Sequence, residues 1–318
     1  MDSGNLTIHY LNVGHGDCTV IEHPSGRITV IDTTNGEAID RDRVEAKLRA
    51  MRKDARVFNL LRARGLSAKA ALKEMDVSVE LTNPLEFLER MYPDKPIFRY
   101  IQTHPEMDHM RGLDALLRDR DVKTFWDTEN DRDGGDMRNS DLADWEAYRS
   151  MRDDDRRRPF VRGYDWDYFG SAATNDKIDI LSPTAWWTRQ CDQDEDWNNM
   201  SVVIRVMHNG RSFVFGGDAE PAAWEHMMAD PAVKAKLKDV TVLKASHHGR
   251  LSGYDEPAVT WMSPDCVVMS IGKDCDHEAI EDYENHTDLV LSTYDCGDIT
   301  MTVDETGKVT YETSLVPA

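Results

Sequence analysis

Hydrophobic residues near the start of the chain alternate with polar ones over short stretches. Residues 6–13, 18–22 and 27–31 are rich in β-branched and other apolar residues, and turn-forming segments at 14–17 and 24–26 separate them. Short apolar runs bounded by glycine, proline and aspartate are typical of β-strands joined by tight turns. The pattern therefore predicts an array of paired strands at the edge of a sheet.

The spacing of apolar residues becomes helical after these strands. Apolar residues recur every three or four positions among arginine, lysine and glutamate, first at 44–61 and again at 68–75. A helix start signal, Thr82-Asn83-Pro84, precedes a further stretch of this kind. We expect an insertion of two or three helices at about 40–96, followed by a strand over 97–102.

The rest of the chain alternates strand patterns with helical ones. A polar segment at about 127–175, rich in aspartate, arginine and aromatic residues, predicts a loop or lid with a short helix. We expect one α/β domain over residues 1–318, with insertions at about 40–96 and about 127–175. The remaining predicted elements are helices over 112–118 and 221–237, strands over 178–181, 201–207, 211–215, 240–244 and 266–270, and a hairpin over 298–311.

Charge narrows the choice of substrate. The formal net charge is −21, and a uniformly acidic surface repels polyanions, because neutralisation of phosphates drives most nucleic-acid binding. Long DNA or RNA is therefore disfavoured. Basic residues are dense at 41–64 and 152–158, and a bound divalent metal reverses the local field, so a short nucleic acid stays an alternative.

The cysteines and the start of the chain add two expectations. Five cysteines, widely spaced and without a C-x-x-C pair, suggest neither a disulfide framework nor a thiolate zinc cluster. The sequence lacks an apolar run of about 18 residues, and residues 1–10 have no basic segment followed by an apolar stretch. We expect a cytoplasmic protein that does not insert in a membrane.

Four polar clusters follow predicted strands and contain the residues suited to chemistry. They lie, in chain order, at 103–109, 198–201, 216–218 and 246–249. Carboxylate oxygens suit hard divalent ions, and imidazole suits zinc, manganese or iron. One histidine alone would usually be structural, but Asp and His brought together from separate loops predict a metal site.

These clusters resemble the metal-binding motifs of metallo-β-lactamase-fold hydrolases. The resemblance rests on T-H-P-E-M-D-H, F-G-G-D-A-E and V-L-K-A-S-H-H-G, and on the opening L-N-V-G-H-G-D-C-T-V-I and I-T-V-I-D-T-T-N. It is greatest for the branch related to the hydrolase domain of the DNA-uptake protein ComEC, and it spans roughly residues 6–272. The resemblance implies a four-layer αβ/βα sandwich with metal at one edge, between two β-sheets.

The resemblance also implies roles for individual residues. Asp108 and His109 match the ligands of one metal, and Asp218 matches the carboxylate that bridges two metals. His247 is the favoured late histidine ligand, although strand register leaves the choice between His247 and His248 open. In catalysis Asp108 would orient the attacking water, Asp218 would hold it between the ions, and His248 would protonate the leaving group.

The second metal position departs from the family pattern. Glu106 stands where a second histidine of the H-x-H motif is expected, which leaves His104 with a carboxylate neighbour. A further histidine expected between the Asp-His and Gly-Asp motifs is absent, since His208 next to a predicted turn is the one histidine in that interval. We therefore expect one or two divalent ions, zinc or manganese with magnesium as an alternative, and an oxygen-rich second site.

Other polar residues near the motifs have weaker predicted roles. Asp17 and Asp32 follow strands at turns, and we expect them to support the ligands rather than bind metal. We expect the remaining histidines to be structural. Among them His15 is the one best placed for a role at the site, because it lies in the loop with Asp17. Asn199 and Ser201 either contact a substrate phosphate or end a strand.

Three functions remain open on the sequence. The favoured one is a phosphodiesterase or nuclease-like hydrolase of a nucleotide, a short nucleic acid or another phosphate ester. The second is a hydrolase of esters, lactones or amides. The third is a catalytically degenerate subunit that binds or regulates a protein partner through the helical insertion. The oligomeric state is not predicted.

Overall fold

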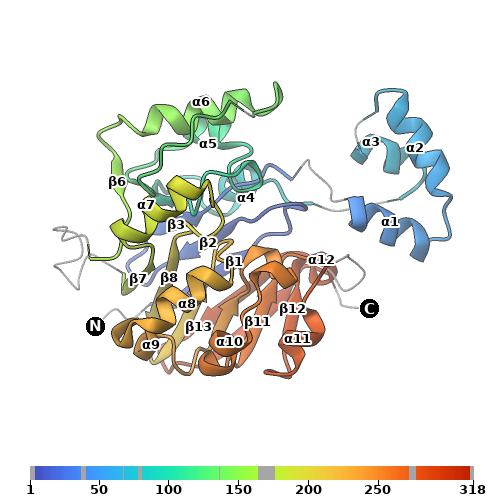
Figure 1. The fold of residues 1–318 in the computed structure, drawn as a ribbon. Helices are drawn as coiled ribbons and strands as arrows, with labels where there is room; N and C mark the ends of the chain where they lie inside the picture. The colour runs from blue at the N-terminus through green and yellow to red at the C-terminus, as the bar shows by residue number, and fades with distance from the viewer. Residues whose placement is uncertain are drawn as a thin grey trace.

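Two β-sheets packed face to face form the body of the protein, and helices cover both outer faces (Figure 1). The computed structural model describes residues 4–36, 41–66, 68–77, 81–135, 137–163, 176–271 and 277–315. Parts of both expected insertions, at 37–40, 67, 78–80, 136 and 164–175, lie outside the described residues, as does Cys275. Within the described residues, none of the helices combines the length and apolar character needed to cross a bilayer.

The first sheet has eight strands within the described residues, in the order β14-β13-β1-β2-β3-β4-β5-β6. The pairs from β14 to β3 are antiparallel, and those from β3 to β6 are parallel. In chain order the strands are β1 (Leu6–Tyr10), β2 (Thr19–Glu22), β3 (Ile28–Ile31), β4 (Ile97–Ile101), β5 (Phe125–Asp127), β6 (Arg157–Pro159), β13 (Ile299–Val303) and β14 (Val309–Thr313).

The second sheet has six strands within the described residues, in the order β12-β11-β10-β9-β8-β7. The hairpins β7-β8 and β8-β9 are antiparallel, and β9 to β12 run parallel. The strands are β7 (Ile178–Ser182), β8 (Val203–His208), β9 (Arg211–Phe215), β10 (Val242–Lys244), β11 (Cys266–Met269) and β12 (Val290–Ser292).

Three hydrophobic cores hold the layers together. One lies between the sheets and includes Trp126, Phe160 and Phe215. A second lies between the second sheet and its helices, and a third lies between the first sheet and its helices. Each sheet thus buries both faces, and the αβ/βα layering that the family resemblance implied is confirmed.

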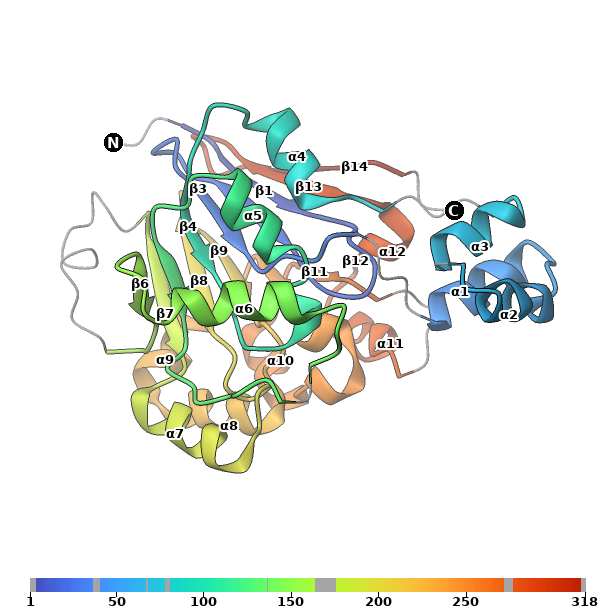
Figure 2. The same ribbon diagram turned by 90° about the horizontal axis from the view of Figure 1, so that it is seen from above.

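The two helical layers lie on opposite sides of the sheets in Figure 1, and Figure 2 looks onto the layer that contains α5 and α6. On the first sheet lie α4 (Pro84–Met91), α5 (Leu113–Asp119) and α6 (Leu142–Met151). The other helices of the body are α7 (Ala185–Asp194), α8 (Pro221–Ala229), α9 (Pro231–Lys236), α10 (Glu256–Met262), α11 (Ile280–Glu284) and α12 (Thr293–Cys296).

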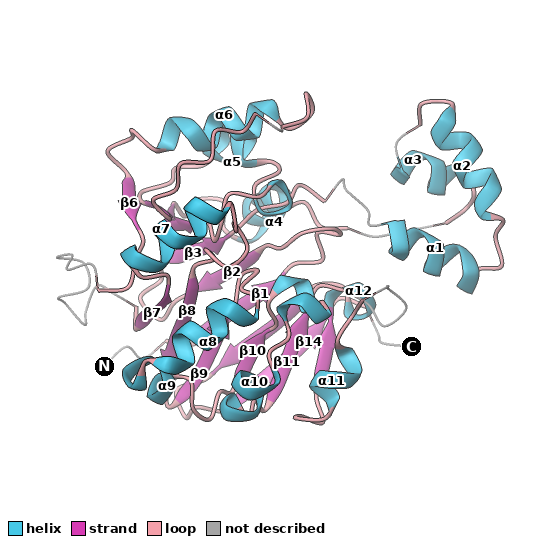
Figure 3. Ribbon diagram, viewed as in Figure 1, coloured by secondary structure: helices cyan, strands magenta, loops and turns pink. Residues whose placement is uncertain are grey.

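Three further helices lie to one side of the sheets (Figures 1 and 3). This helical unit consists of α1 (Arg41–Ala50), α2 (Ala55–Ala63) and α3 (Ala68–Glu74), and it has a small core of its own that includes Val44 and Leu72. Gly36 and Thr82, on the body side of the helical unit, lie side by side, since a Cβ added at Gly36 would lie 2.6 Å from the Thr82 carbonyl oxygen.

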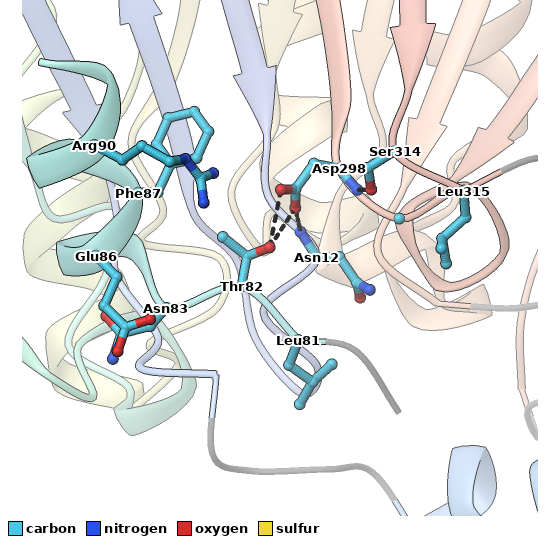
Figure 4. Close-up of a pocket in the computed structure, with 11 residues that line it drawn as sticks. Asn12, Leu81, Thr82, Asn83, Glu86, Phe87, Arg90, Asp298, Ser314 and Leu315 are labelled. Carbon is cyan, nitrogen blue, oxygen red and sulfur yellow. Dashed lines mark hydrogen bonds between the residues drawn. The ribbon is translucent and has the colours of Figure 1, made fainter. Parts of the chain in front are cut away.

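The returning connection is fixed to the first sheet beside a small cavity of about 260 Å³ (Figure 4). The Asp298 carboxylate accepts hydrogen bonds from Thr82 Oγ1 at 2.8 and 2.9 Å and from the Asn12 amide at 2.8 Å. These bonds join the segment before α4 to the start of β13. The helix α4 therefore packs on the first sheet and not on the helical unit.

Several elements differ in length from the predictions. The strand expected over 6–13 ends at Tyr10, because the chain then turns and the Leu11 amide bonds the Cys18 carbonyl at 3.0 Å. The helix expected over 221–237 is divided into α8 and α9. Asp230 causes the division: its backbone is extended, and its carboxylate accepts from the Ala232 amide at 2.8 Å, which caps a new helix.

Candidate metal centre

Four buried side chains from separate loops meet at one edge of the sandwich. They are Asp17 between β1 and β2, His109 in the 3₁₀ turn η1 (Met107–His109), Asp218 after β9, and His248 in η2 (His247–Gly249). One ligand atom from each lies within 4.8 Å of all the others. Two carboxylates and two imidazoles at this spacing could hold a metal ion.

Asp218 lies between the two histidines of this cluster. Its Oδ1 atom is 3.2 Å from His109 Nε2, and its Oδ2 atom is 3.4 Å from His248 Nε2. On the other side of the His248 ring, Nδ1 is 3.3 Å from Asp17 Oδ2. Each oxygen of the Asp218 carboxylate therefore lies close to one of the two imidazoles.

Several of these atoms are buried and make no contact with hydrogen-bond geometry in the described part of the chain, although the pairs above lie within ion-pair distance. They are His109 Nε2, His248 Nδ1, Asp218 Oδ1 and, next to them, His104 Nε2. Buried polar atoms are normally hydrogen-bonded, and leaving one unpaired costs about 1–3 kcal/mol. A divalent cation would satisfy these atoms together, so the residues present fit a metal.

The protonation states point the same way. Burial lowers the pKa of His248, but the carboxylates of Asp218 and Asp17 outweigh it and raise the pKa to about 10. Asp218 and Asp32 likewise raise the pKa of His109 well above its ordinary value, against burial. Burial raises the pKa of Asp218, yet His109 and His248 hold it well below the ordinary value. The carboxylates thus stabilise positive charge at this position. A bound metal ion can supply that charge when the imidazoles lose their protons.

Asp32 fixes His109 from behind. Its Oδ2 atom is 2.7 Å from His109 Nδ1 and accepts from Thr103 Oγ1 at 2.7 Å, while Oδ1 accepts from the Thr103 amide at 2.8 Å. This bond leaves Nε2 of His109 directed at the cluster. The arrangement is the one by which carboxylates orient metal-binding histidines.

The polar side-chain atoms of Ser201 and Asn199 make contacts within the protein. Ser201 Oγ accepts from the Asp218 amide at 2.9 Å and lies 3.4 Å from His104 Nδ1. Asn199 Oδ1 accepts from the amides of Glu220 and Ala223 at 3.1 and 3.0 Å, at the start of α8. Both residues therefore hold the loop that presents Asp218.

The two adjacent histidines occupy positions opposite to the expected ones. His248 belongs to the buried cluster, whereas His247 Nε2 lies 3.8 Å from Asp218 Oδ2 and its Nδ1 atom contacts Ser252 Oγ at 2.8 Å and Glu220 Oε1 at 3.2 Å. Both histidines have positive φ, 49° and 62°. The chain turns here, so the alternation of a strand does not determine which side chain faces inward.

The remaining predicted ligands lie around the cluster. Asp108 Oδ2 is 3.2 Å from His248 Nε2 and 3.4 Å from His15 Nε2. The His104 ring centroid is 4.3 Å from that of His109, and burial lowers the pKa of His104 to about 3. Glu106 lies further out, with Oε1 3.3 Å from Arg132 Nη1.

Gly16 permits the close approach that brings Asp17 to the cluster. A Cβ at Gly16, where φ is 134°, would lie 2.2 Å from the Asp108 carbonyl oxygen. The Asp17 amide donates to the same carbonyl at 3.4 Å. A side chain at position 16 would therefore separate the Asp17 loop from the Asp108 loop.

Two residues of the centre have a role in the structure that the sequence did not suggest. Asp17 was expected to support ligands and instead lies within the four-residue cluster, and Lys244 was assigned no role although its Nζ atom contacts Asp17 at 3.0 Å. The G-H-G-D turn and the lysine of V-L-K-A-S-H-H-G were the available signals.

Comparison with known proteins gives structural likenesses at low identity. Neither protein-family models nor curated proteins match the sequence. A metallo hydrolase from the archaeon Ignicoccus hospitalis is 11% identical, with a TM-score of 0.44 over 96% of this chain and 98% of that one. The diiron β-hydroxylase CmlA from Streptomyces venezuelae is 13% identical (TM-score 0.41, 83% of this chain, 44% of that one). A long-form RNase Z from yeast is 10% identical (TM-score 0.38, 96% and 43%).

Proposed function

We propose that the protein is a metal-dependent hydrolase of the metallo-β-lactamase fold that acts on phosphodiesters. The observation on which this proposal rests is the buried convergence of Asp17, His109, Asp218 and His248, where His109 Nε2, His248 Nδ1 and Asp218 Oδ1 make no hydrogen bond within the described residues. The αβ/βα layering and the motif resemblance support the assignment of the fold family.

The residues divide into ligands and groups that handle protons. Asp17, His109, Asp218 and His248 would hold a divalent ion, which when bound activates a water and withdraws charge from the phosphoryl oxygen. Asp108 Oδ2 lies beside this set, 3.2 Å from His248 Nε2, and receives the proton from the attacking water. His15 Nε2, 3.4 Å from Asp108, is placed to give a proton to the leaving oxygen.

These assignments revise several roles expected from the sequence. Asp17, expected to support the ligands, becomes a ligand, and Asp108, expected as a ligand, becomes the proton acceptor. His248 becomes a ligand, because its ring lies within the cluster, and the proton-donor role passes to His15. His104, whose Nε2 atom is buried and without a partner in the described residues, and His247, close to Asp218, are the residues available to a second ion.

A substrate panel tests the proposal. Metal-free protein is supplied with manganese, zinc or magnesium and assayed on bis-p-nitrophenyl phosphate, cyclic nucleotides, and single-stranded DNA and RNA, with nitrocefin and lactones as the ester and amide arm. We expect metal-dependent turnover of at least one phosphodiester, its loss in Asp218→Asn, and its retention in Asp304→Asn, which changes an exposed turn. Turnover of none of them by any metal form would sink the proposal.

The helical unit favours a second candidate function, the binding of an acidic protein partner. Residues 41–77 contain eleven Lys and Arg and five Asp and Glu, a net charge of +6 in a chain of −21. On α2, Val57 and Leu60 are 46% and 53% exposed, and an exposed apolar strip among cations suits an acidic, partly apolar surface. Elemental analysis separates the candidates, because a purely binding subunit would contain well under one metal per chain.

A further inference from the structure

A cavity of about 360 Å³ opens beside the candidate metal centre. Its wall includes Asp108 and His15, which lie next to His248 in the cluster, together with Arg111, Arg132 and Arg138. The volume falls within the range of about 300–1,000 Å³ typical of small-ligand pockets. A substrate held at the metal centre would therefore extend past Asp108 into this space.

The cavity is lined by residues that precede α6, by His15, and by residues of η1 and of the turn that leads to α5. The helices α5 and α6 lie side by side (Figure 2), and Asp144 of α6 accepts from the amides of Gly112 and Asp114 at 2.9 Å each. The same contacts fix the residues next to Arg111, which precedes α5, relative to α6. The arginine wall is thus built on anchored elements.

Two of the guanidinium groups are held in place by neighbouring groups. Arg132, with a side chain 11% exposed, donates to the Pro105 carbonyl at 2.7 Å and lies 5.5 Å from the ring centroid of Trp197. Arg111 Nε lies 3.5 Å from Asp141 Oδ1. A guanidinium that is already oriented loses less freedom when it binds an anion.

Arg138 completes the wall at its exposed rim. Glu106 and Asp141 also line the cavity, but each lies within 3.5 Å of one of the arginines and so orients it. Three guanidinium groups around one space match the several acceptor oxygens of a phosphate, which takes paired N–H donors from arginine. In a chain of net charge −21, these three arginines offset the three carboxylates that also line the cavity, Glu106, Asp108 and Asp141.

We propose that this arginine subsite binds a phosphate group of the substrate other than the one that is cleaved. The inference rests on the proposed hydrolase function and names its substrate class: a phosphodiester with a second phosphate near the scissile bond, as in a 5′-phosphorylated oligonucleotide. Arg111, Arg132 and Arg138 are the donors, and the subsite sets which phosphodiester is preferred.

A binding experiment tests the subsite without catalysis. Inorganic phosphate is titrated into metal-free protein and followed by tryptophan fluorescence, since Trp197 contacts Arg132. We expect saturable binding in the wild type, binding about tenfold weaker in Arg138→Gln and Arg111→Gln from the loss of one charge-assisted bond, and unchanged binding in Arg118→Gln, which alters an exposed arginine of α5. No saturable binding, or equal binding in all four proteins, would overturn the proposal.

A kinetic experiment uses a matched pair of substrates, the dinucleotides TpT and pTpT. We expect the wild type to prefer pTpT by about tenfold in kcat/KM, and the ratio to fall towards one in Arg138→Gln but not in Arg118→Gln. A wild-type ratio of one contradicts the subsite. If neither dinucleotide nor any other phosphodiester is hydrolysed, the proposed function fails, and the phosphate titration still decides whether the subsite exists.

Discussion

Lys244 and Asp17 are 227 residues apart in the sequence, yet the lysine Nζ atom lies 3.0 Å from both oxygens of the aspartate. Lys244 is 5% exposed and extends from β10. Ser270 Oγ also donates to Asp17. Lys244 and His248 lower the pKa of Asp17 below its ordinary value, although burial alone would raise it. The lysine therefore keeps this carboxylate charged and joins the second sheet to the β1–β2 loop.

The first prediction concerns this pair. Lys244→Met should lower the free energy of unfolding by about 3 kcal/mol, because it removes the lysine partner of a buried carboxylate. Adding Asp17→Asn should restore a large part of the loss. Urea denaturation of metal-free wild type, both single variants and the double variant measures the coupling. Additive effects would mean that the pair does not interact.

The second prediction concerns the support behind His109. Asp32→Asn should weaken metal binding about 10–100-fold, because the amide no longer holds the imidazole with Nε2 directed at the cluster. Metal titration against a competing chelator provides the measurement. The exposed variant Asp304→Asn serves as the control, and an affinity equal to wild type in Asp32→Asn would show that Asp32 does not position the ligand.

The third prediction distinguishes the adjacent histidines. His248→Gln should remove metal binding, because His248 lies in the four-residue cluster. His247→Gln should weaken it by less, because its ring contacts Ser252 and Glu220. Metal content per chain after dialysis reports on both variants. The reverse order would restore the assignment based on motif resemblance.

The fourth prediction concerns pH and a histidine remote from the centre. His9 is buried, with Nε2 2.9 Å from Tyr92 Oη, and burial lowers its pKa to about 4. The folded pKa lies below the unfolded value of 6.5, so the neutral ring contributes stability above pH 6.5 that is lost as the pH falls towards 4. At pH 5 the loss is about 2 kcal/mol.

Urea denaturation at pH 7.5 and pH 5 measures this effect in the wild type and in His9→Gln. The variant should show a smaller difference between the two pH values, whatever its absolute stability. His23, whose pKa burial lowers to about 3, should maintain part of the dependence. An identical pH difference in both proteins would exclude His9 as a source.

Local sequence predicted the elements whose signals are local. β9 has the predicted bounds, Arg211–Phe215, because alternating apolar residues follow an Asn-Gly turn. The helix start at Asn83-Pro84 was also recognisable, since Asn83 Oδ1 accepts from the Leu85 amide at 2.9 Å. The three-residue strand β12 was missed, because its pairing with β11 depends on tertiary packing.

The candidate centre could likewise be predicted only as far as its signals are local. The motifs located the loops of Asp108, Asp218 and the two histidines, but they could not determine which atoms face inward. His248 replaces His247 because η2 turns the chain through positive φ. Asp17 joins the cluster because Gly16 allows two loops to touch. Both facts are properties of the three-dimensional packing.

The most direct measurement of the central claim is anomalous diffraction from crystals grown with manganese or zinc. We expect an anomalous peak within coordination distance of Asp17, His109, Asp218 and His248, and its disappearance in crystals of Asp218→Asn. A structure with the metal present in the crystal but with no peak among these four side chains would contradict the account.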